Sequence, residues 1–392
     1  MNILHVANNA APQFGGAYRS IGLFRAAAAS KNYPTHCISF DDEPSKNPHA
    51  QDPYWSVVPT CKGAIGTHYG LISRRDADKL AELVKWADVV CVHLLYRYHV
   101  IWAAHCARKF GKPLIVIPHG GLDPYVFTYR GFRKKAWLKA YRNLVFRDSV
   151  LLYATDREMR KAALAVSGVK AKSLYWPMDD AVCRRADTSP RVPGVPRRLL
   201  FVGRLHSCKR VLETVRAFSR LREPGWQLVL VGAESEEISA EDLRRAASDQ
   251  WNVSVFYGGV LDRSSLYTEY SRASGLVLMS HKENFGHAVA EAMRFGLPVI
   301  ISDGVDLGGV VIAAGAGTVV PVRSEEAIVD GLKQFLRRPP EELDRFGTAA
   351  KIAATKLFDF QNFSESYNSM LESLASPRPH AAASVRPLPL SA

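Results

Sequence analysis

The stretch "ADTSPRVPGVPRR", residues 186–198, followed directly by "LLFVGR", residues 199–204, decides how this chain is divided. The first part is rich in Pro, Gly and Arg and has no hydrophobic periodicity, which is typical of a boundary between domains. The second part is an apolar run of strand length. A chain of 392 residues also exceeds what one typical hydrophobic core supports. The sequence therefore predicts domains at 1–185 and 199–357, joined by a linker at 186–198.

Short apolar runs alternate with helical patterns on both sides of this linker. The strand candidates are residues 2–7, 87–95 and 113–118 before it, and residues 199–202, 227–232, 275–280 and 298–302 after it. Between the strands, Thr155 and Glu158 have the spacing of a capping box, which predicts a helix start. This alternation is typical of parallel sheets covered by helices on both faces, so we predict an α/β fold with two doubly wound, Rossmann-like domains.

The end of the chain departs from this alternation. Residues 358–375 form one more helical pattern beyond the second sheet, and we expect this helix to cross back to the first domain. Residues 376–392, "SPRPHAAASVRPLPLSA", are of low complexity, and we expect a disordered tail.

Composition narrows the class of protein. The net charge of +13 favours an anionic partner. The charge is concentrated in one segment and no nucleic-acid reader motif is present, so we expect no nucleic acid partner. The six cysteines lack the spacing of a zinc site or a disulfide framework, and no signal peptide or membrane-spanning segment is evident. These features predict a cytoplasmic protein with reduced thiols.

A second stretch, "HKENFGHAVAEAMRFGLPV" at residues 281–299, carries two glutamates. If a helix begins near Phe285, its apolar residues form one stripe, and His287, Glu291 and Arg294 lie opposite. The simplest interpretation of Glu291 is then a residue of a solvated face. Glu283 precedes the helix, and Glu291 lies about 9 Å further along it at 1.5 Å per residue. That separation suits the two sugars of a nucleotide sugar.

Backbone and cations near strand ends suit the diphosphate of such a ligand. The amides of Phe285, Gly286 and His287 would face it at the helix N-terminus. After the strand at 199–202, Gly203 is followed by Arg204 and Lys209. These two cations suit a diphosphate, and the alternative is that both are solvated surface residues. Gly15 and Gly16 follow the first strand, where glycine allows close approach of a ligand or serves only the turn.

Taken together, these motifs resemble those of the retaining GT-B glycosyltransferases of glycosyltransferase family 4, the group 1 glycosyltransferases. The resemblance runs in the expected order from the first strand to the last helix and rests on Gly15, Gly16, Pro118, His119, Gly120, Gly203, Arg204, Lys209, Glu283 and Glu291. It implies a GT-B architecture, in which two Rossmann-like domains face a central cleft. It also implies a nucleoside diphosphate sugar as co-substrate, with neither metal nor cofactor.

The resemblance also implies roles for individual residues. Arg204 and Lys209 would stabilise the leaving diphosphate, and Gly16 would cap it. His119 would contact the donor sugar near the reacting carbon. Glu283 would bind donor-sugar hydroxyls with the backbone of residues 284–286, and Glu291 would bind the ribose. The donor-binding set implied is Gly15, Gly16, Gly203, Asn284, Phe285, Gly286, His287 and Glu291, and the catalytic set is His119, Arg204, Lys209 and Glu283.

The acceptor implied is a glycan or lipid-linked glycan, in bacterial surface polysaccharide or lipopolysaccharide biosynthesis. Asp123 and Tyr125 are candidates for the acceptor side of the cleft. Residues 101–150 hold ten Lys and Arg against two Asp. Within them, residues 130–147 interleave cations with aromatic residues, which suits an anionic membrane surface at the inner face of the cytoplasmic membrane as well as ordinary packing on the first domain.

Other functions fit parts of this pattern. A nucleotide-sugar epimerase or a phosphorylase of the same fold would share the donor-binding motifs. A nicotinamide-dependent oxidoreductase also needs a doubly wound domain. Its fingerprint of three spaced glycines is, however, incomplete in "NNAAPQFGGAYRS" at residues 8–20.

Overall fold

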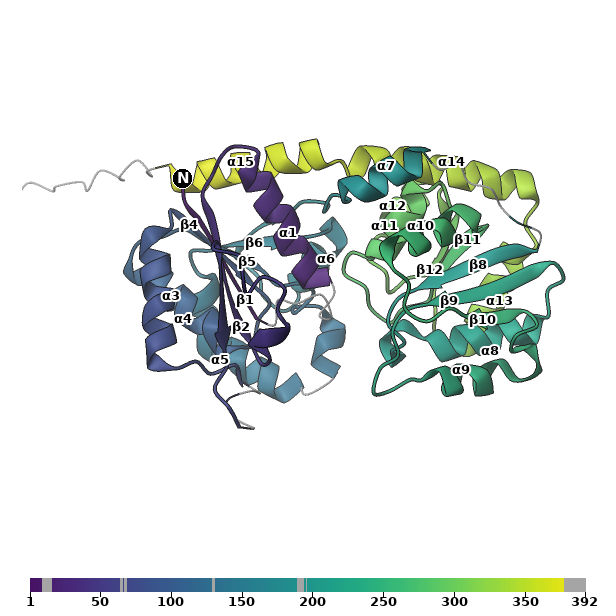
Figure 1. Cartoon of the computed structure of the whole chain (residues 1–392), viewed down its shortest axis with the longest axis horizontal. Helices are drawn as coiled ribbons and strands as arrows, with labels where there is room; N and C mark the ends of the chain where they lie inside the picture. The colour runs from purple at the N-terminus through teal and green to yellow at the C-terminus, as the bar shows by residue number, and fades with distance from the viewer. Residues whose placement is uncertain are drawn as a thin grey trace, which may run out of the picture.

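Two parallel β-sheets form the framework of the computed structural model (Figure 1). The structure describes residues 1–8, 16–63, 66, 69–128, 131–188, 194 and 196–376. The first sheet has seven strands in the order β3-β2-β1-β4-β5-β6-β7, and the second has six in the order β10-β9-β8-β11-β12-β13. In both sheets the strand order reverses next to the first strand, as in doubly wound folds. The predicted α/β fold of two Rossmann-like domains is therefore confirmed.

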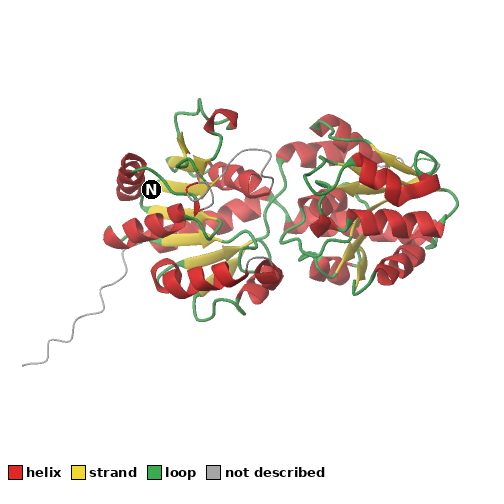
Figure 2. Ribbon diagram, turned by 90° about the horizontal axis from the view of Figure 1, so that it is seen from below, coloured by secondary structure: helices red, strands yellow, loops and turns green. Residues whose placement is uncertain are grey.

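The first domain is built around a sheet whose central strands are buried on both faces. Its strands are β1 (Ile3–Asn8), β2 (Thr35–Asp41), β3 (Trp55–Pro59), β4 (Val89–His93), β5 (Leu114–Ile117), β6 (Val150–Tyr153) and β7 (Lys170–Ser173). Its helices are α1 (Gly16–Ala29), α3 (Arg74–Trp86), α4 (Tyr98–Lys109), α5 (Gly131–Phe146) and α6 (Asp156–Ala162). Every residue of β1 is buried, and His5 on this strand pairs in register with Cys37 and Cys91. Helices cover both faces of the sheet (Figure 2).

The second domain repeats this plan. Its strands are β8 (Arg197–Val202), β9 (Trp226–Val231), β10 (Val255–Tyr257), β11 (Gly275–Leu278), β12 (Val299–Ser302) and β13 (Gly317–Val320). Its helices are α8 (Val211–Leu221), α9 (Ala240–Ala247), α10 (Arg263–Arg272), α11 (His287–Arg294), α12 (Gly308–Ala314), α13 (Glu325–Leu336) and α14 (Pro340–Leu357). Gly232, which follows β9, has a φ of 149°, and a Cβ there would fall on the carbonyl of Gly203. Only glycine therefore allows the two strand ends to approach this closely.

The last helix, α15 (Phe360–Ala375), returns to the first domain and packs against α1, as Figure 1 shows along the top of the molecule. The Asn368 amide donates to the Ala27 carbonyl at 2.8 Å, and the Ser364 and Ser30 hydroxyls lie 2.8 Å apart. The tail from residue 377 lies outside the described residues. Within the described residues, none of the helices is both long and apolar enough to span a bilayer.

The region between the domains differs from the predicted linker at 186–198. Residues 186–188 are the last turn of α7 (Asp180–Thr188), and Arg197 and Arg198 already belong to β8. Helix α7 packs against α10 and α11 of the second domain, although the predicted boundary assigned residues 180–185 to the first. Ion pairing explains the difference, because both carboxylate oxygens of Asp187 accept from the Arg294 guanidinium of α11 at 2.8 and 2.6 Å.

Candidate active site

A cavity of about 440 Å³ opens between the domains at the carboxyl ends of the second sheet's strands. In parallel α/β sheets this is the edge at which ligands bind. Side chains of α1 in the first domain form one wall, and the second domain supplies the rest. The lining residues are Tyr18, Arg19, Val202, Gly203, Lys209, Arg263, Leu266, Tyr267, Leu278, Glu283, Gly286, His287, Ala288 and Glu291.

Lys209 and Glu283 form an ion pair in this cavity. Lys209 ends the short 3-10 helix Ser207–Lys209 that follows β8. Glu283 is held by its backbone, because its N–H donates to the Gly304 carbonyl at 3.0 Å and its carbonyl accepts from the Asp306 N–H at 2.9 Å. Burial lowers the pKa of Lys209 to about 8. The pair therefore places a cation and a carboxylate, both on fixed backbone, at the strand ends of the second sheet.

Helix α11 begins at His287, two residues later than the predicted start near Phe285. Gly286 caps it in the left-handed conformation with a φ of 82°. A side chain at this position would be strained, since the left-handed region favours glycine. Phe285 itself is buried, and its ring centroid lies 5.8 Å from that of Trp176 in the first domain. The first turn of α11 therefore lines the cavity, whereas Phe285 packs behind it.

The far face of α11 is buried, so the interpretation of Glu291 as a residue of a solvated face is wrong. Glu291 and Arg294 are each only 6% exposed. Glu291 accepts from the Tyr270 hydroxyl at 3.0 Å, and its other oxygen lies 2.6 Å from the Arg19 guanidinium of α1. The face is covered because α7 packs on it and Tyr270 of α10 reaches Glu291. Glu291 thus forms an ion pair across the two domains.

His119 lies at the end of a chain of three buried or half-buried histidines. Its Nε2 is 2.9 Å from Nδ1 of His93, and Nε2 of His93 is 2.9 Å from Nδ1 of His5. Burial lowers the pKa of both His5 and His119 to about 3, so these rings are neutral near pH 7. Each neutral ring carries one N–H, and the two hydrogen bonds therefore run in the same direction along the chain. The ring of His119 contacts Trp176, beside the 440 Å³ cavity rather than in its wall.

Gly120, next to His119, is a point of close contact between the domains. Its carbonyl accepts from the Lys282 ammonium at 2.6 Å, and its N–H donates to Glu158 at 2.6 Å. Glu158 also accepts from the Ala154 amide, and burial raises its pKa to about 7. The predicted helix start at Thr155 is observed, but Glu158 binds the His119 loop instead of completing a capping box. Asn284 lies so close to Gly120 that a Cβ there would fall on its amide.

Of the two acceptor-side candidates, Tyr125 contacts the second domain directly, and Asp123 reaches it only through a lysine. Asp123 is buried and lies 3.1 Å from the Lys161 ammonium of α6, which in turn lies 2.7 Å from Asp306 of the second domain. The ring of Tyr125 stacks on His281 with the centroids 5.6 Å apart. Binding an acceptor through Asp123 and Tyr125 would therefore require these contacts to open.

The structure separates some of the predicted residues from the cavity. Arg204 is exposed and lines a different depression, with His206 and residues 234–237. Burial is the main cause of the lowered pKa of Lys209, and the charge of Arg204 lowers it further. Gly15 lies outside the described residues, and Gly16 is the first residue of α1.

Sequence reasoning missed two cations that the structure places at the cleft, Arg19 and Arg263. It took a third, Lys282, for a charge beside Glu283 that tunes which sugar fits. Arg19 lies in the first turns of α1, three residues after Gly16, so its position after the glycine loop was an available signal. Arg263 lines the cavity and pairs with Asp179. Lys282, next to Glu283 in sequence, turns instead to Gly120. The described residues contain no cluster of three or more His, Cys, Asp and Glu side chains arranged to hold a metal ion.

Two helix-covered parallel sheets on either side of this cavity define the GT-B fold. Residues 185–353 match the family described as Glycosyl transferases group 1. A GDP-mannose:cellobiosyl-diphosphopolyprenol alpha-mannosyltransferase of Xanthomonas oryzae pv. oryzae is 24% identical over 383 residues, which cover 92% of this chain and 94% of that protein.

Solved structures show the same fold over almost the whole chain. Anabaena HepE in complex with UDP matches with a TM-score of 0.74 and 16% identity, covering 95% of this chain and 100% of HepE. The lipopolysaccharide outer core galactosyltransferase WaaB in its apo form matches with a TM-score of 0.67 and 18% identity, covering 94% of this chain and 100% of WaaB. The comparisons thus establish the GT-B fold and support a glycosyltransferase of group 1.

Proposed function

We propose that this chain is a retaining, metal-independent glycosyltransferase of glycosyltransferase family 4. It moves a hexose or N-acetylhexosamine from a nucleoside diphosphate sugar to a hydroxyl of a glycan or lipid-linked glycan. The convergence of Lys209, Glu283, Glu291 and the first turn of α11 on one interdomain cavity carries the proposal. The mannosyltransferase relative, which covers nearly the whole chain, supports a lipid-linked acceptor and makes GDP-mannose the first donor to test.

The diphosphate lies between Lys209 and the N-terminus of α11. Lys209 is held by Glu283 in the unliganded protein, and the incoming phosphate oxygens take over this cation. Amides of the first turn of α11 point along the helix axis toward the same anion, where the helix dipole favours negative charge. These groups stabilise the charge that develops on the leaving diphosphate, the kind of electrostatic assistance that usually dominates such catalysis.

The two glutamates bind the sugars at either end of the diphosphate. Glu283, released from Lys209, accepts from hydroxyls of the transferred sugar, and Glu291 accepts from the ribose. His119 approaches the transferred sugar from the first domain. The bond between the anomeric carbon and the phosphate oxygen breaks with its electron pair on that oxygen. The acceptor oxygen bonds to the same face of the carbon, and its proton passes to the departing phosphate oxygen.

A donor panel tests the proposal. The melting temperature of the protein is measured with GDP- and UDP-sugars and with NAD. If the protein is a transferase, one of the nucleotide sugars should shift the melting temperature. NAD alone shifting the melting temperature would instead support an oxidoreductase. The anomeric configuration of the product, read by NMR, tests retention, and turnover in EDTA tests metal independence.

An epimerase or a phosphorylase of the same fold is the alternative. A transferase releases nucleoside diphosphate only when an acceptor hydroxyl is present, beyond slow hydrolysis. Formation of an isomerised nucleotide sugar without acceptor, or release of a sugar phosphate in the presence of inorganic phosphate, would contradict the proposal.

The proposed setting is the cytoplasmic face of the membrane, in surface polysaccharide or lipopolysaccharide assembly. Helix α5 (Gly131–Phe146) carries most of the basic segment 130–147, and its Phe132 side chain is 85% exposed. An exposed aromatic residue among cations suits peripheral binding to anionic lipid. Co-sedimentation with anionic liposomes should exceed that with neutral ones and fall with salt, and equal binding to both would contradict this setting.

A further inference from the structure

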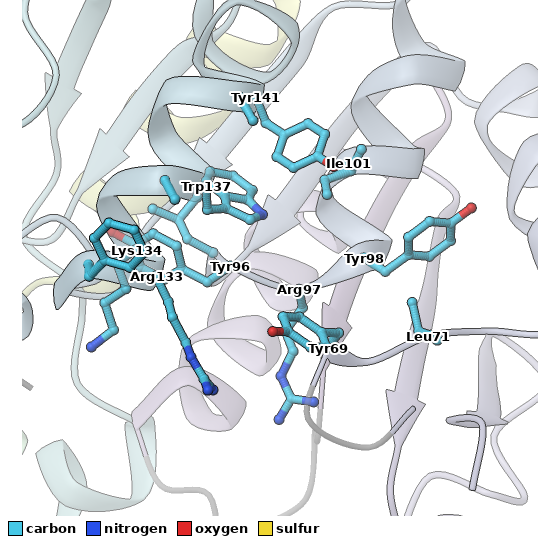
Figure 3. Close-up of a pocket in the computed structure, with 14 residues that line it drawn as sticks. Tyr69, Leu71, Tyr96, Arg97, Tyr98, Ile101, Arg133, Lys134, Trp137 and Tyr141 are labelled. Carbon is cyan, nitrogen blue, oxygen red and sulfur yellow. The ribbon is translucent and has the colours of Figure 1, made fainter. Parts of the chain in front are cut away.

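A second cavity, of about 620 Å³, lies in the first domain between α4 and α5. Figure 3 shows the rings of Tyr96, Trp137 and Tyr141 gathered on one side, and the guanidinium groups of Arg97 and Arg133 projecting together from the rim. The lining residues are Tyr69, Leu71, Leu95, Tyr96, Arg97, Tyr98, Ile101, Phe132, Arg133, Lys134, Ala136, Trp137, Ala140 and Tyr141. We call this cavity the aromatic groove.

The chemistry of the aromatic groove selects its ligand. Its lining, all of it within the described residues, contains three cations and no Asp, Glu, Asn or Gln. Tyrosine hydroxyls and cations can also bind sugar hydroxyls, but rings and aliphatic side chains form most of this lining, which suits an apolar chain. The Lys134 ammonium donates to the Val126 carbonyl at 2.7 Å, and the positive charge of the rim favours an anionic group at one end of that chain. The groove therefore fits an apolar chain that ends in a phosphate or diphosphate.

The aromatic groove adjoins the loop that carries His119. The Tyr96 hydroxyl donates to the carbonyl of Gly121 at 2.7 Å. Leu95 also lines the groove and packs beside Gly121, so that a Cβ on Gly121 would lie 3.4 Å from its Cδ1. Gly121 is two residues from His119, in the loop that contacts Lys282 of the second domain through Gly120. The groove and the interdomain contact at Gly120 therefore lie on the same loop, residues 118–121.

We propose that the aromatic groove binds the first isoprenoid units and the phosphate of a lipid-linked acceptor. This inference rests on the proposed transferase function and gives its acceptor a site. The chain lies against Trp137 and Tyr96, the phosphate meets Arg97 and Arg133 at the rim, and the glycan extends past Gly121 toward the cleft. Because α5 also carries the exposed Phe132, a lipid can enter the groove from the membrane surface while its tail stays in the bilayer.

Farnesyl diphosphate serves as a soluble probe, with inorganic diphosphate and farnesol as partial ligands. Binding is measured by calorimetry in saturating GDP or UDP, whichever the donor panel selects, so that the donor site is filled. Each buried methylene strengthens binding by roughly fourfold, so farnesyl diphosphate should bind at least about 100-fold more tightly than inorganic diphosphate. Equal affinity for the two would overturn the proposal.

Two variants and two matched controls locate the site on α5. Ala140→Trp fills the groove from an exposed position, and Arg133→Glu reverses a rim charge. Asn143→Trp and Lys139→Glu make the same changes at exposed positions outside the groove. The groove variants should weaken farnesyl diphosphate at least about tenfold and raise the KM for lipid-linked acceptor, while the controls change neither.

The donor reaction separates failure of this inference from failure of the function. All four variants should keep the thermal shift with nucleotide sugar and its slow hydrolysis, because the donor cavity is untouched. If these persist but Ala140→Trp binds farnesyl diphosphate normally, the groove proposal is wrong and the transferase proposal stands. If Lys139→Glu weakens binding as much as Arg133→Glu, a general membrane-surface attraction replaces the groove.

Discussion

The ion pair between Arg19 and Glu291 offers a direct test of how the donor is bound. The Glu291 side chain is 8% exposed and that of Arg19 is 24% exposed, with their atoms 2.6 Å apart. A buried charged hydrogen bond contributes about 1.5–3 kcal/mol, and partial exposure of Arg19 moves the pair toward the lower end of that range. Glu291→Gln keeps the shape and the Tyr270 contact, so it should destabilise the unliganded protein by only about 1–2 kcal/mol.

The same substitution should have a larger effect on the donor. If the carboxylate accepts from ribose hydroxyls, losing its charge should weaken nucleotide-sugar binding by about 1.5–3 kcal/mol, or about 10- to 150-fold in Kd. Calorimetry gives the Kd, and denaturant unfolding gives the stability. Arg19→Met is the matched control, since it breaks the same ion pair from the other side and leaves the carboxylate in place.

A double-mutant cycle over Arg19 and Glu291 separates the two roles. The coupling energy in unfolding measures the ion pair, and the loss of affinity unique to Glu291→Gln measures the contact with ribose. If Glu291→Gln and Arg19→Met lower stability alike and neither changes the Kd for nucleotide sugar, Glu291 only joins the domains. The proposed ribose contact would then be wrong.

Three further predictions concern the walls of the cleft. Gly120→Ala should lower kcat at least about tenfold and change the donor Kd only slightly. At the φ of 73° found for Gly120 a side chain is strained, and it would also displace Asn284. A variant with the kcat of the wild type would refute this. His93→Phe removes the hydrogen bond that holds His119, so it should lower kcat about 3- to 10-fold and leave the donor KM unchanged. NMR of the histidine nitrogens should show the loss of the hydrogen bond at His119. An unaltered His119 signal would contradict this prediction. Donor binding should weaken as pH rises through about 8, where Lys209 loses its proton, and Lys209→Arg should remove this dependence; a dependence that persists in the Arg variant would assign it to another group.

The fold was predictable because its signals are local. Each central strand is a short apolar run between polar turns, and β1 and β4 are buried throughout, as the runs at 2–7 and 87–95 indicate. The crossing of α15 back to α1 could also be expected, because a helical pattern beyond the last strand needs a surface to cover. The packing of α7 on the second domain could not be predicted, because Asp187 of α7 pairs with Arg294, which lies more than 100 residues later in the sequence.

The candidate site was predictable where backbone geometry fixes the residue. Lys209 and Glu283 each follow a strand at the same edge of one sheet, so their convergence follows from topology. The burial of Glu291 was not predictable, since a helical pattern shows only that one face is polar. Which helix covers that face depends on contacts far away in the sequence, here α7, α10 and Arg19 of α1. The roles assigned to these residues remain predictions.

The charges in the cavity suit the exchange of partners that the proposed donor site requires. Lys209 is paired with Glu283 and Arg19 with Glu291, so each of the two cations is compensated by a carboxylate. On the proposed function, the diphosphate takes over Lys209, and Glu283 is then free to accept from hydroxyls of the transferred sugar. Arg19 stays with Glu291, whose carboxylate is proposed to accept from the ribose. Because Arg19 belongs to α1 and Glu291 to α11, such a ribose contact would also couple donor binding to the contact between the domains.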